Sequence, residues 1–209
     1  MVLAAFAVEE GSEDSLRKMG VKDSKLLAPA ERERLRGKLE KLGEFVVKQI
    51  SAAELTALMR KRVSLNDIEA KAISESLREL GGKNSLNKVL VDSPEPIASK
   101  FERKIRKYFD HEFEIVCEHK ADLHYPVVGA ASIIAKTVRD EGIEAIKRLL
   151  KKEGVPDWDF GSGYSHDERT VAFLKKHHSL PVLQEFIRHE WKTAKSLKYA
   201  QLDLSKFTG

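Results

Sequence analysis

The sequence contains too few cysteines for a disulfide-stabilised fold. Cys117 is the single cysteine among 209 residues, which excludes an intramolecular disulfide and suits a reducing compartment. No apolar run approaches the roughly 20 residues that a membrane-spanning helix requires, and no basic segment precedes the apolar start of the chain, as it would in a secretory signal. The seven histidines show no spacing typical of a zinc site. We therefore expect a cytoplasmic protein with no membrane partner.

The composition is that of a globular protein with a modest excess of positive charge. Hydrophobic residues make up 42% of the chain and charged residues 33%, and the length suffices for one sizeable core or for one domain with an appendage. The net charge of +4 fits a polyanionic partner. Many basic proteins bind no polyanion, however, so charge alone decides little.

Strand-like and helix-like segments alternate along the chain, which predicts an α/β fold. Apolar runs predict strands at 2–8, 45–50, 89–92 and 113–117. Helical periodicity predicts helices over 28–42, 52–59, 66–80, 97–109, 127–151, 167–177 and 183–197. Ser51 and Glu54 have the spacing of a capping box, and Asn66 is the expected cap of the next helix.

Two acidic residues occupy positions where metal-binding side chains occur. Asp92 ends an apolar strand just before Ser93 and Pro94, and sites in α/β sheets form at the carboxyl ends of strands. Asp122 lies in a short polar turn before a long helix that opens with small residues. Taken singly, each is better explained as a turn-forming Asp. As a pair, their oxygens suit a hard cation such as Mg²⁺ or Mn²⁺.

Five blocks of the chain, in order, resemble the archaeal ribonucleases HII, which are type 2 ribonucleases H. They are Val21–Leu26, Leu90–Ser93, His119–Lys136, Gly161–Thr170 and Trp191–Thr193. The resemblance implies a ribonuclease H-like α/β fold, a mixed sheet flanked by helices, with a C-terminal helical part and a short tail. It also implies an endoribonuclease that cleaves the RNA strand of RNA–DNA hybrids, and at ribonucleotides embedded in duplex DNA, by two-metal-ion hydrolysis.

The same resemblance gives roles to individual residues. It makes Asp92 and Asp122 catalytic acids that hold Mg²⁺ or Mn²⁺. The substrate contacts that it implies are Tyr164, Lys22, Ser24 and Lys25. Tyr164 could instead pack its loop onto the body of the protein, and the two lysines could be ordinary surface residues.

The family's opening motif, Asp-Glu-Ala-Gly-Arg-Gly, is absent from the sequence. We therefore expect that the family's first strand and two of its four catalytic acids are missing, that Met1 is an internal start or a truncation, and that the chain cleaves its substrate poorly. The alternatives are a non-catalytic hybrid-binding module and a truncated pseudoenzyme. The expected parts are a ribonuclease H-like α/β domain over 1–150, a helical part over 151–198 that completes the substrate site, and a flexible tail over 199–209.

The tail carries a short pattern that suggests a protein partner. Gln201, Leu204 and Phe207 match the Q-x-x-h-x-x-a motif by which archaeal and eukaryotic replication proteins bind the sliding clamp. In a short turn, Leu204 and Phe207 would lie on one side and fill an apolar pocket. The alternative is a frayed C-terminus with chance hydrophobic residues.

Overall fold

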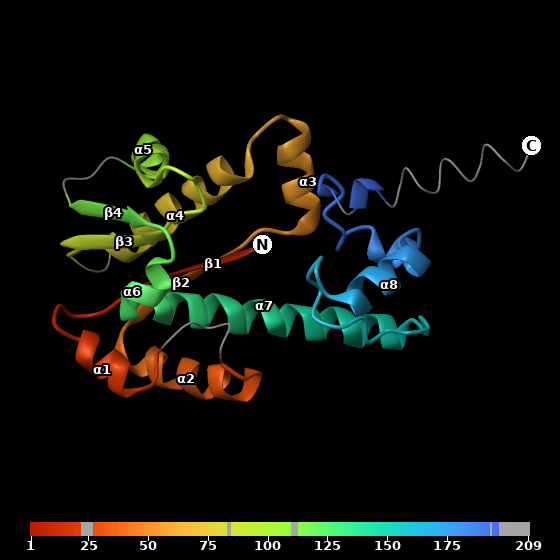
Figure 1. Cartoon of the computed structure of the whole chain (residues 1–209), viewed down its shortest axis with the longest axis horizontal. Coiled ribbons are helices and arrows are strands. Elements are labelled where there is room, and N and C mark those ends of the chain that lie inside the picture. The colour runs from red at the N-terminus through yellow and green to blue at the C-terminus, as the bar shows by residue number, and fades with distance from the viewer. Residues whose placement is uncertain (22–26, 83–84, 110–112, 193, 197–209) are drawn as a thin grey trace, which may run out of the picture. The chain divides into compact units, whose positions relative to one another are not determined.

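The computed structural model describes residues 1–21, 27–82, 85–109, 113–192 and 194–196. The chain divides into two compact units, whose elements Figure 1 traces. The α/β unit comprises residues 2–49 and 64–139, and the helical unit comprises residue 1, residues 50–63 and the chain from residue 140. No helix in the described ranges is long and apolar enough to cross a membrane.

The strands of the α/β unit form two pairs of opposite sense. β1 (Val2–Ala7) pairs antiparallel with β2 (Glu44–Gln49). β3 (Lys88–Asp92) pairs parallel with β4 (Glu114–Glu118). Among the described residues, two helices lie between β1 and β2, so this antiparallel pair is not a hairpin. The parallel pair requires a crossover between β3 and β4, and the helix that the sequence pattern predicts over 97–109 supplies it.

Helices flank the strands of this unit. They are α1 (Glu13–Lys18), α2 (Pro29–Leu42), α4 (Leu65–Gly81), α5 (Ala98–Tyr108), α6 (Ala121–His124) and the first half of α7 (Pro126–Lys152). Helix α4 contacts β1, β2 and α5, and α5 contacts β4. In Figure 1, α4 and α5 lie on one side of the strands, and α1, α2 and α7 lie on the other. The expected mixed α/β fold with flanking helices is therefore confirmed.

Two hydrophobic clusters hold the α/β unit together. In the first, Phe6 of β1 packs with Leu16, Leu35 and Ile134, which come from α1, α2 and α7. Burying a Leu or Ile side chain fully contributes about 1.5–3 kcal/mol each. Ala130 is fully buried in the same cluster, so the small residues that open α7 allow close packing there.

The second cluster joins α4 and α5 to the β3–β4 pair. Ser74 of α4 is fully buried, and its hydroxyl oxygen lies 2.7 Å from the carbonyl oxygen of Ala70 and 3.0 Å from that of Ile105 in α5, so the two carbonyl oxygens share its one hydrogen. This hydroxyl therefore links the two helices inside the core. Cys117 of β4 packs against the cluster, and burial raises the pKa of its thiol to about 12.

The helical unit is built from α3 (Ala52–Arg60), the second half of α7, α8 (Glu168–His177) and a short 3₁₀ turn, η2 (Pro181–Leu183). Its apolar core contains Leu150, Val155, Phe160, Phe173 and Leu183. The core is small, and its aromatic pair, Phe160 and Phe173, packs with ring centroids 5.4 Å apart.

One predicted helix cap is confirmed and another is wrong. Ser51 caps α3, and its hydroxyl accepts the N–H of Glu54 at 3.0 Å, as the capping box predicts. Helix α4, however, is capped by Ser64 and not by Asn66. Ser64 has extended backbone angles, accepts the N–H of Asp67 at 3.2 Å and also hydrogen-bonds the Asp67 carboxylate. These two contacts favour the earlier start.

The helix expected over 183–197 is wrong for residues 184–191, which form turns and bends after η2. Backbone hydrogen bonds there reach only three residues back: Phe186 donates to Leu183 at 3.0 Å and Trp191 donates to Arg188 at 3.1 Å. The sequence patterns also missed α1 and α6. These helices have six and four residues, too short to show helical periodicity.

Candidate active site

The two acidic residues singled out in the sequence come from neighbouring segments of the α/β unit. Asp92 is the last residue of β3, and its backbone pairs in parallel register with Glu118, the last residue of β4. Two residues separate Glu118 from α6, in which Asp122 is the second residue. The Asp92 side chain is exposed, whereas Asp122 is only 7% exposed.

A hydrogen bond joins these two segments. The backbone N–H of Ala121 donates to Oδ1 of Asp92 at 3.2 Å. Because Ala121 is the neighbour of Asp122 along the chain, the structure brings the two acids to the same end of the β3–β4 pair. This placement depends on α6, the one-turn helix that the sequence pattern did not reveal.

The turn into α6 has an unusual backbone conformation. Lys120, the N-cap residue, has φ 56° and ψ 36°, which is the left-handed region. Such a conformation is uncommon for a residue with a side chain, and it persists only where the surroundings hold it. It reverses the chain between β4 and α6, immediately before the N–H that meets Asp92.

The side chain of Glu118 contacts the C-terminal end of α6. Its Oε2 accepts the hydroxyl of Tyr125 at 2.8 Å, and its Oε1 pairs with Nδ1 of His124. The Tyr125 hydrogen bond, followed by His124, lowers the pKa of the Glu118 carboxyl, and the same bond raises the pKa of Tyr125. Glu118 is therefore charged and engaged in holding the helix that carries Asp122.

The loop that follows Asp92 is fixed by charge. Glu95 is 8% exposed and lies 2.8 Å from Nζ of Lys104 in α5, and the same ammonium group lies 3.1 Å from Asp67 in α4. The Lys104 hydrogen bond is the main cause that lowers the pKa of Glu95, and Glu95 in turn raises the pKa of Lys104. Asp92 is therefore followed by a loop that the two helices hold in place.

The donor chemistry of Asp92 and Asp122 fits a hard divalent cation. Mg²⁺ in proteins is commonly held by one or two carboxylates, with water and substrate phosphates completing its shell. One oxygen of Asp92 already accepts a protein N–H, which orients the carboxylate. Among the residues that the structure describes, no group of three or more His, Cys, Asp or Glu side chains is arranged to hold a metal ion. The fit is therefore to a site of few protein ligands.

A second group of candidate residues lies in the helical unit, in the glycine-rich loop before α8. Asp167, the N-cap of α8, folds this loop by accepting hydrogen bonds from Ser162 and from the N–H of Arg169. The N–H of Gly163 donates to Oγ1 of Thr170 at 2.9 Å, and that hydroxyl donates to the Phe160 carbonyl at 2.8 Å. Hydrogen bonds that join Asp167 and Thr170 to residues 160–163 therefore close the loop.

Gly161 is required at its position in this loop. Its φ is +84°, and a Cβ atom there would lie 2.6 Å from Oδ2 of Asp167. Only glycine adopts this conformation without strain and leaves room for the carboxylate.

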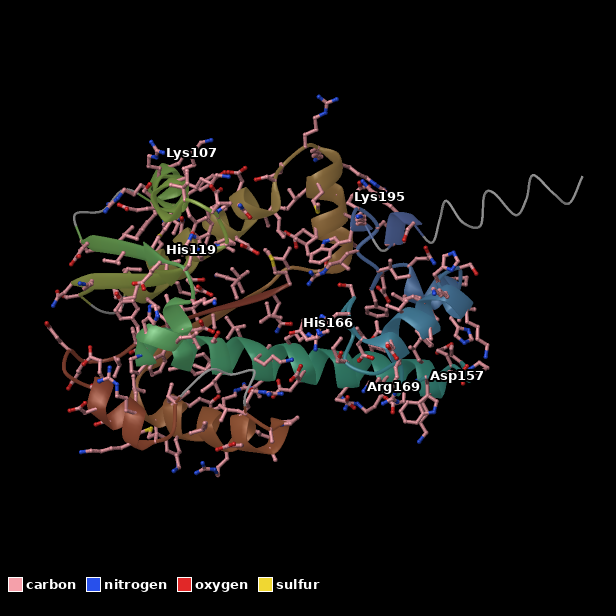
Figure 2. All side chains as sticks on the ribbon, in the orientation of Figure 1. Lys107, His119, Asp157, His166, Arg169 and Lys195 are labelled. Atoms are coloured by element: carbon pink, nitrogen blue, oxygen red, sulfur yellow. The ribbon has the colours of Figure 1, made fainter. Side chains whose placement is uncertain are left out.

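Tyr164 stands at the exposed part of the loop, with 38% of its surface accessible. Its ring stacks on that of His166, with centroids 5.2 Å apart and planes inclined by 16°. The rings of Tyr164 and His166, both exposed residues, therefore form a stacked pair on this loop. Figure 2 labels His166 and Arg169 in this part of the chain.

The remaining residues predicted from the sequence lie outside the part of the chain that the structure describes. They are Lys22, Ser24, Lys25, Gln201, Leu204 and Phe207.

Sequence reasoning missed several residues that shape these loops. His119, labelled in Figure 2, contacts the loop after Asp92 through both ring nitrogens. A histidine between a strand and a candidate acid was the available signal, but histidines were weighed only as zinc ligands. Glu118 and Tyr125 have no local pattern that would show their hydrogen bond, because it requires the turn at Lys120.

The described strands and helices make a mixed α/β protein that has two acids at one end of the β3–β4 pair. Residues 1–194 match the family model described as ribonuclease HII, and the chain belongs to this family. It is 39% identical over 223 aligned residues to the ribonuclease HII of Methanocaldococcus jannaschii, covering 100% of this chain and 90% of the relative. The ribonuclease HII of Pyrococcus abyssi is 37% identical, with 99% and 90% covered.

Solved structures agree with this assignment. The ribonuclease HII of Archaeoglobus fulgidus, solved in complex with PCNA, matches with a TM-score of 0.78 at 36% identity, over 94% of this chain and 88% of that one. Ribonuclease H2 from Pyrococcus horikoshii matches with a TM-score of 0.72 at 31% identity, over 96% and 98%. Membership of the family supports a hydrolytic ribonuclease that acts on RNA–DNA hybrids.

Proposed function

We propose that this chain is a metal-dependent endoribonuclease that cleaves the RNA strand of RNA–DNA hybrids and cleaves at ribonucleotides embedded in duplex DNA. The observation that carries the proposal is the hydrogen bond from Ala121 to Asp92, because it places Asp122 and Asp92 at one end of the β3–β4 pair. Family membership supports the reaction class, and the position of the two acids supports this choice of site.

In this proposal Asp92 and Asp122 hold Mg²⁺ or Mn²⁺. A bound divalent ion supplies an activated water molecule at neutral pH and stabilises the charge on the leaving 3′-oxygen. Asp92 is exposed to solvent, whereas Asp122 is buried within α6. Glu118 positions α6 through Tyr125 and His124.

Tyr164 is proposed to contact the sugar or base at the RNA–DNA junction, within the part of the chain after residue 150 that contributes to substrate binding. Its exposure and its stacking on His166 support this role over loop packing. Lys22, Ser24 and Lys25 are proposed to contact phosphates, which position a nucleic acid without reading its sequence.

The test is replacement of each acid by its near-isosteric amide. Asp92→Asn and Asp122→Asn should each lower hybrid cleavage by about 100-fold or more, since metal-ion catalysis supplies several kcal/mol. Hybrid binding should persist, because phosphate contacts dominate affinity. The matched control is Glu114→Gln, which removes an exposed acid at the other end of β4 that pairs with Lys88 at 3.2 Å. Near-normal cleavage by either Asn variant would reassign that residue to a structural turn.

A non-catalytic hybrid-binding module is the second candidate. The observation in its favour is that the described residues provide only two acids at this site and no larger metal-binding group. This alternative would be favoured if the protein bound the hybrid but did not cleave it in either Mg²⁺ or Mn²⁺, and if Asp92→Asn left hybrid affinity unchanged.

We further propose that the tail binds a sliding clamp through Gln201, Leu204 and Phe207. The related enzyme from Archaeoglobus fulgidus was solved as a complex with PCNA, which supports such a partner. Calorimetric titration of the source organism's clamp with a peptide covering residues 198–209 tests it. Binding that disappears on Leu204→Ala plus Phe207→Ala supports the proposal, and absence of binding at high micromolar peptide refutes it.

A further inference from the structure

The ring of His119 contacts the loop after Asp92 through both of its nitrogens. Nδ1 lies 3.1 Å from the carbonyl oxygen of Ser93, and Nε2 lies 3.2 Å from that of Pro96. A carbonyl oxygen only accepts hydrogen bonds, and imidazole carries at least one N–H in either of its protonation states. At least one of the two contacts is therefore always a hydrogen bond.

We propose that His119 is a positioning residue for the metal site, an inference that rests on the proposed function of Asp92 and Asp122. Its ring fastens the connection between β4 and α6 to the loop Ser93–Pro96. The N–H of Ala121 is thereby held against the Asp92 carboxylate, and Asp122 is held beside it.

The loop that the His119 ring contacts is itself held in place by other hydrogen bonds and an ion pair, so these contacts can fix the position of the β4–α6 connection. The N–H of Ser93 donates to the Glu118 carbonyl at 2.9 Å. The Glu95 carboxylate lies 2.8 Å from Nζ of Lys104 in α5. The segment after Asp92 is therefore held by β4 at Ser93 and by α5 at Glu95. The His119 ring adds contacts from the β4–α6 connection to the carbonyl oxygens of this segment.

The backbone on the other side of His119 needs such a hold. Lys120 follows directly in the left-handed conformation, and Ala121 follows Lys120. A residue with a side chain persists in this region only where its neighbours determine it. Without the His119 ring, Lys120 can relax towards ordinary angles, and the N–H of Ala121 then leaves Asp92.

The consequence is measurable as metal affinity. Residues that orient a metal ligand without touching the ion typically change metal affinity or activity by about 10–100-fold when they are removed. His119→Ala should therefore weaken Mn²⁺ binding to the full chain by about tenfold or more. His119→Gln keeps one amide donor able to reach one carbonyl oxygen, so it should bind Mn²⁺ with intermediate affinity.

The experiment has two readouts that do not depend on cleavage. Electron paramagnetic resonance titration with MnCl₂ measures Mn²⁺ affinity, and NMR hydrogen exchange in metal-free protein measures the protection of the Ala121 amide. His119→Ala should accelerate exchange at Ala121 severalfold. The matched control is Arg103→Ala, which removes an exposed basic side chain of α5 and should alter neither readout.

The outcomes separate this proposal from the proposed function. If Asp92→Asn abolishes Mn²⁺ binding while His119→Ala changes neither affinity nor Ala121 exchange, the positioning role is wrong and the metal site stands. If His119→Ala lowers only thermal stability, its role is structural, which also overturns the proposal. If Asp92→Asn leaves Mn²⁺ binding unchanged, the metal site itself is wrong, and Ala121 exchange alone then decides whether His119 holds the turn.

Discussion

One oxygen of Asp167, Oδ2, accepts both the backbone N–H and the hydroxyl of Ser162, each at 2.6 Å. The other oxygen accepts the N–H of Arg169 at 2.9 Å. The Ser162 hydroxyl, followed by the Ser162 N–H, holds the pKa of the Asp167 carboxyl well below its usual range. A single charged side chain therefore closes the loop that presents Tyr164.

Replacing Asp167 with Asn should disorder this loop while changing side-chain volume little. An amide can offer its one oxygen to Ser162 or to Arg169 but not to both, and it loses the charge that strengthens these bonds. Cleavage at a lone ribonucleotide should fall by up to about 100-fold, the cost of a displaced positioning group. Asp157→Asn is the control, since Asp157 pairs with Lys176 at 2.7 Å and takes no part in the loop. Equal losses in the two variants would show that the effect is one of charge and not of loop geometry.

Tyr164→Ala should reduce cleavage at a single ribonucleotide in duplex DNA more than it reduces affinity for duplex DNA. A stacked aromatic contributes about 1–3 kcal/mol per base contact. Tyr164→Phe should keep most of the effect, and His166→Ala should have an intermediate effect because it removes the stacked neighbour. Parallel measurements of cleavage rate and of DNA affinity check this. Losses of equal size in both would mean that Tyr164 serves loop packing.

Stability should depend on pH through Asp159. Lys147 at 3.0 Å, followed by Arg169 at 2.7 Å, lowers the pKa of Asp159 from 3.8 to about 2. A carboxyl group whose pKa is lower in the folded than in the unfolded protein stabilises the folded state at pH values above the unfolded-state pKa. This stabilisation is lost as the pH falls through the folded-state pKa. The stability difference between wild type and Asp159→Asn should be constant above about pH 5 and should shrink as the pH approaches 2.

Urea unfolding at a series of pH values measures this difference. About 1 M NaCl should reduce the difference at neutral pH, because salt screens exposed ion pairs. A gap that stays constant down to pH 2 would contradict the assignment of the shift to Asp159.

Ser74→Ala should destabilise the α/β unit more than Ser76→Ala does. Both hydroxyls are buried, but that of Ser76 donates only within α4, to Ala72 at 2.9 Å, whereas that of Ser74 also reaches Ile105 of α5. A lost buried hydrogen bond costs about 1 kcal/mol, which lowers Tm by about 2–4 °C in a chain of this size. Calorimetric Tm values of the two variants test this, and equal values would deny the α4–α5 link any energetic role.

The sequence predicted most elements of regular structure because their signals are local. The strand β3 shows as an apolar run ending in Asp92, and α7 shows as a long helical pattern behind small residues. At the start of α4, Ser64 and Asn66 were both possible caps, and the spacing of Ser64 and Asp67, which is the same as that of Ser51 and Glu54, was the signal for the correct one. At 184–191 turns replaced an apparent helical repeat, with backbone hydrogen bonds that reach three residues back.

The candidate site was predictable only in part. The positions of Asp92 and Asp122 at strand and turn boundaries drew attention to both acids. Their proximity depends on the left-handed backbone conformation of Lys120, and the sequence around this lysine gives no sign of it. The grip of His119 on Ser93 and Pro96 joins residues that are 26 and 23 positions apart, so only the folded chain reveals it.

The burial of Cys117 has a practical consequence for spectroscopy. With its pKa raised to about 12, the only thiol of the chain stays protonated at neutral pH, and thiolate-directed reagents such as maleimides should react with it slowly. A second cysteine placed at an exposed site would then be modified selectively, without first removing the native residue. We therefore expect little background labelling by spin labels and fluorophores, so that distances between the loops can be measured in solution.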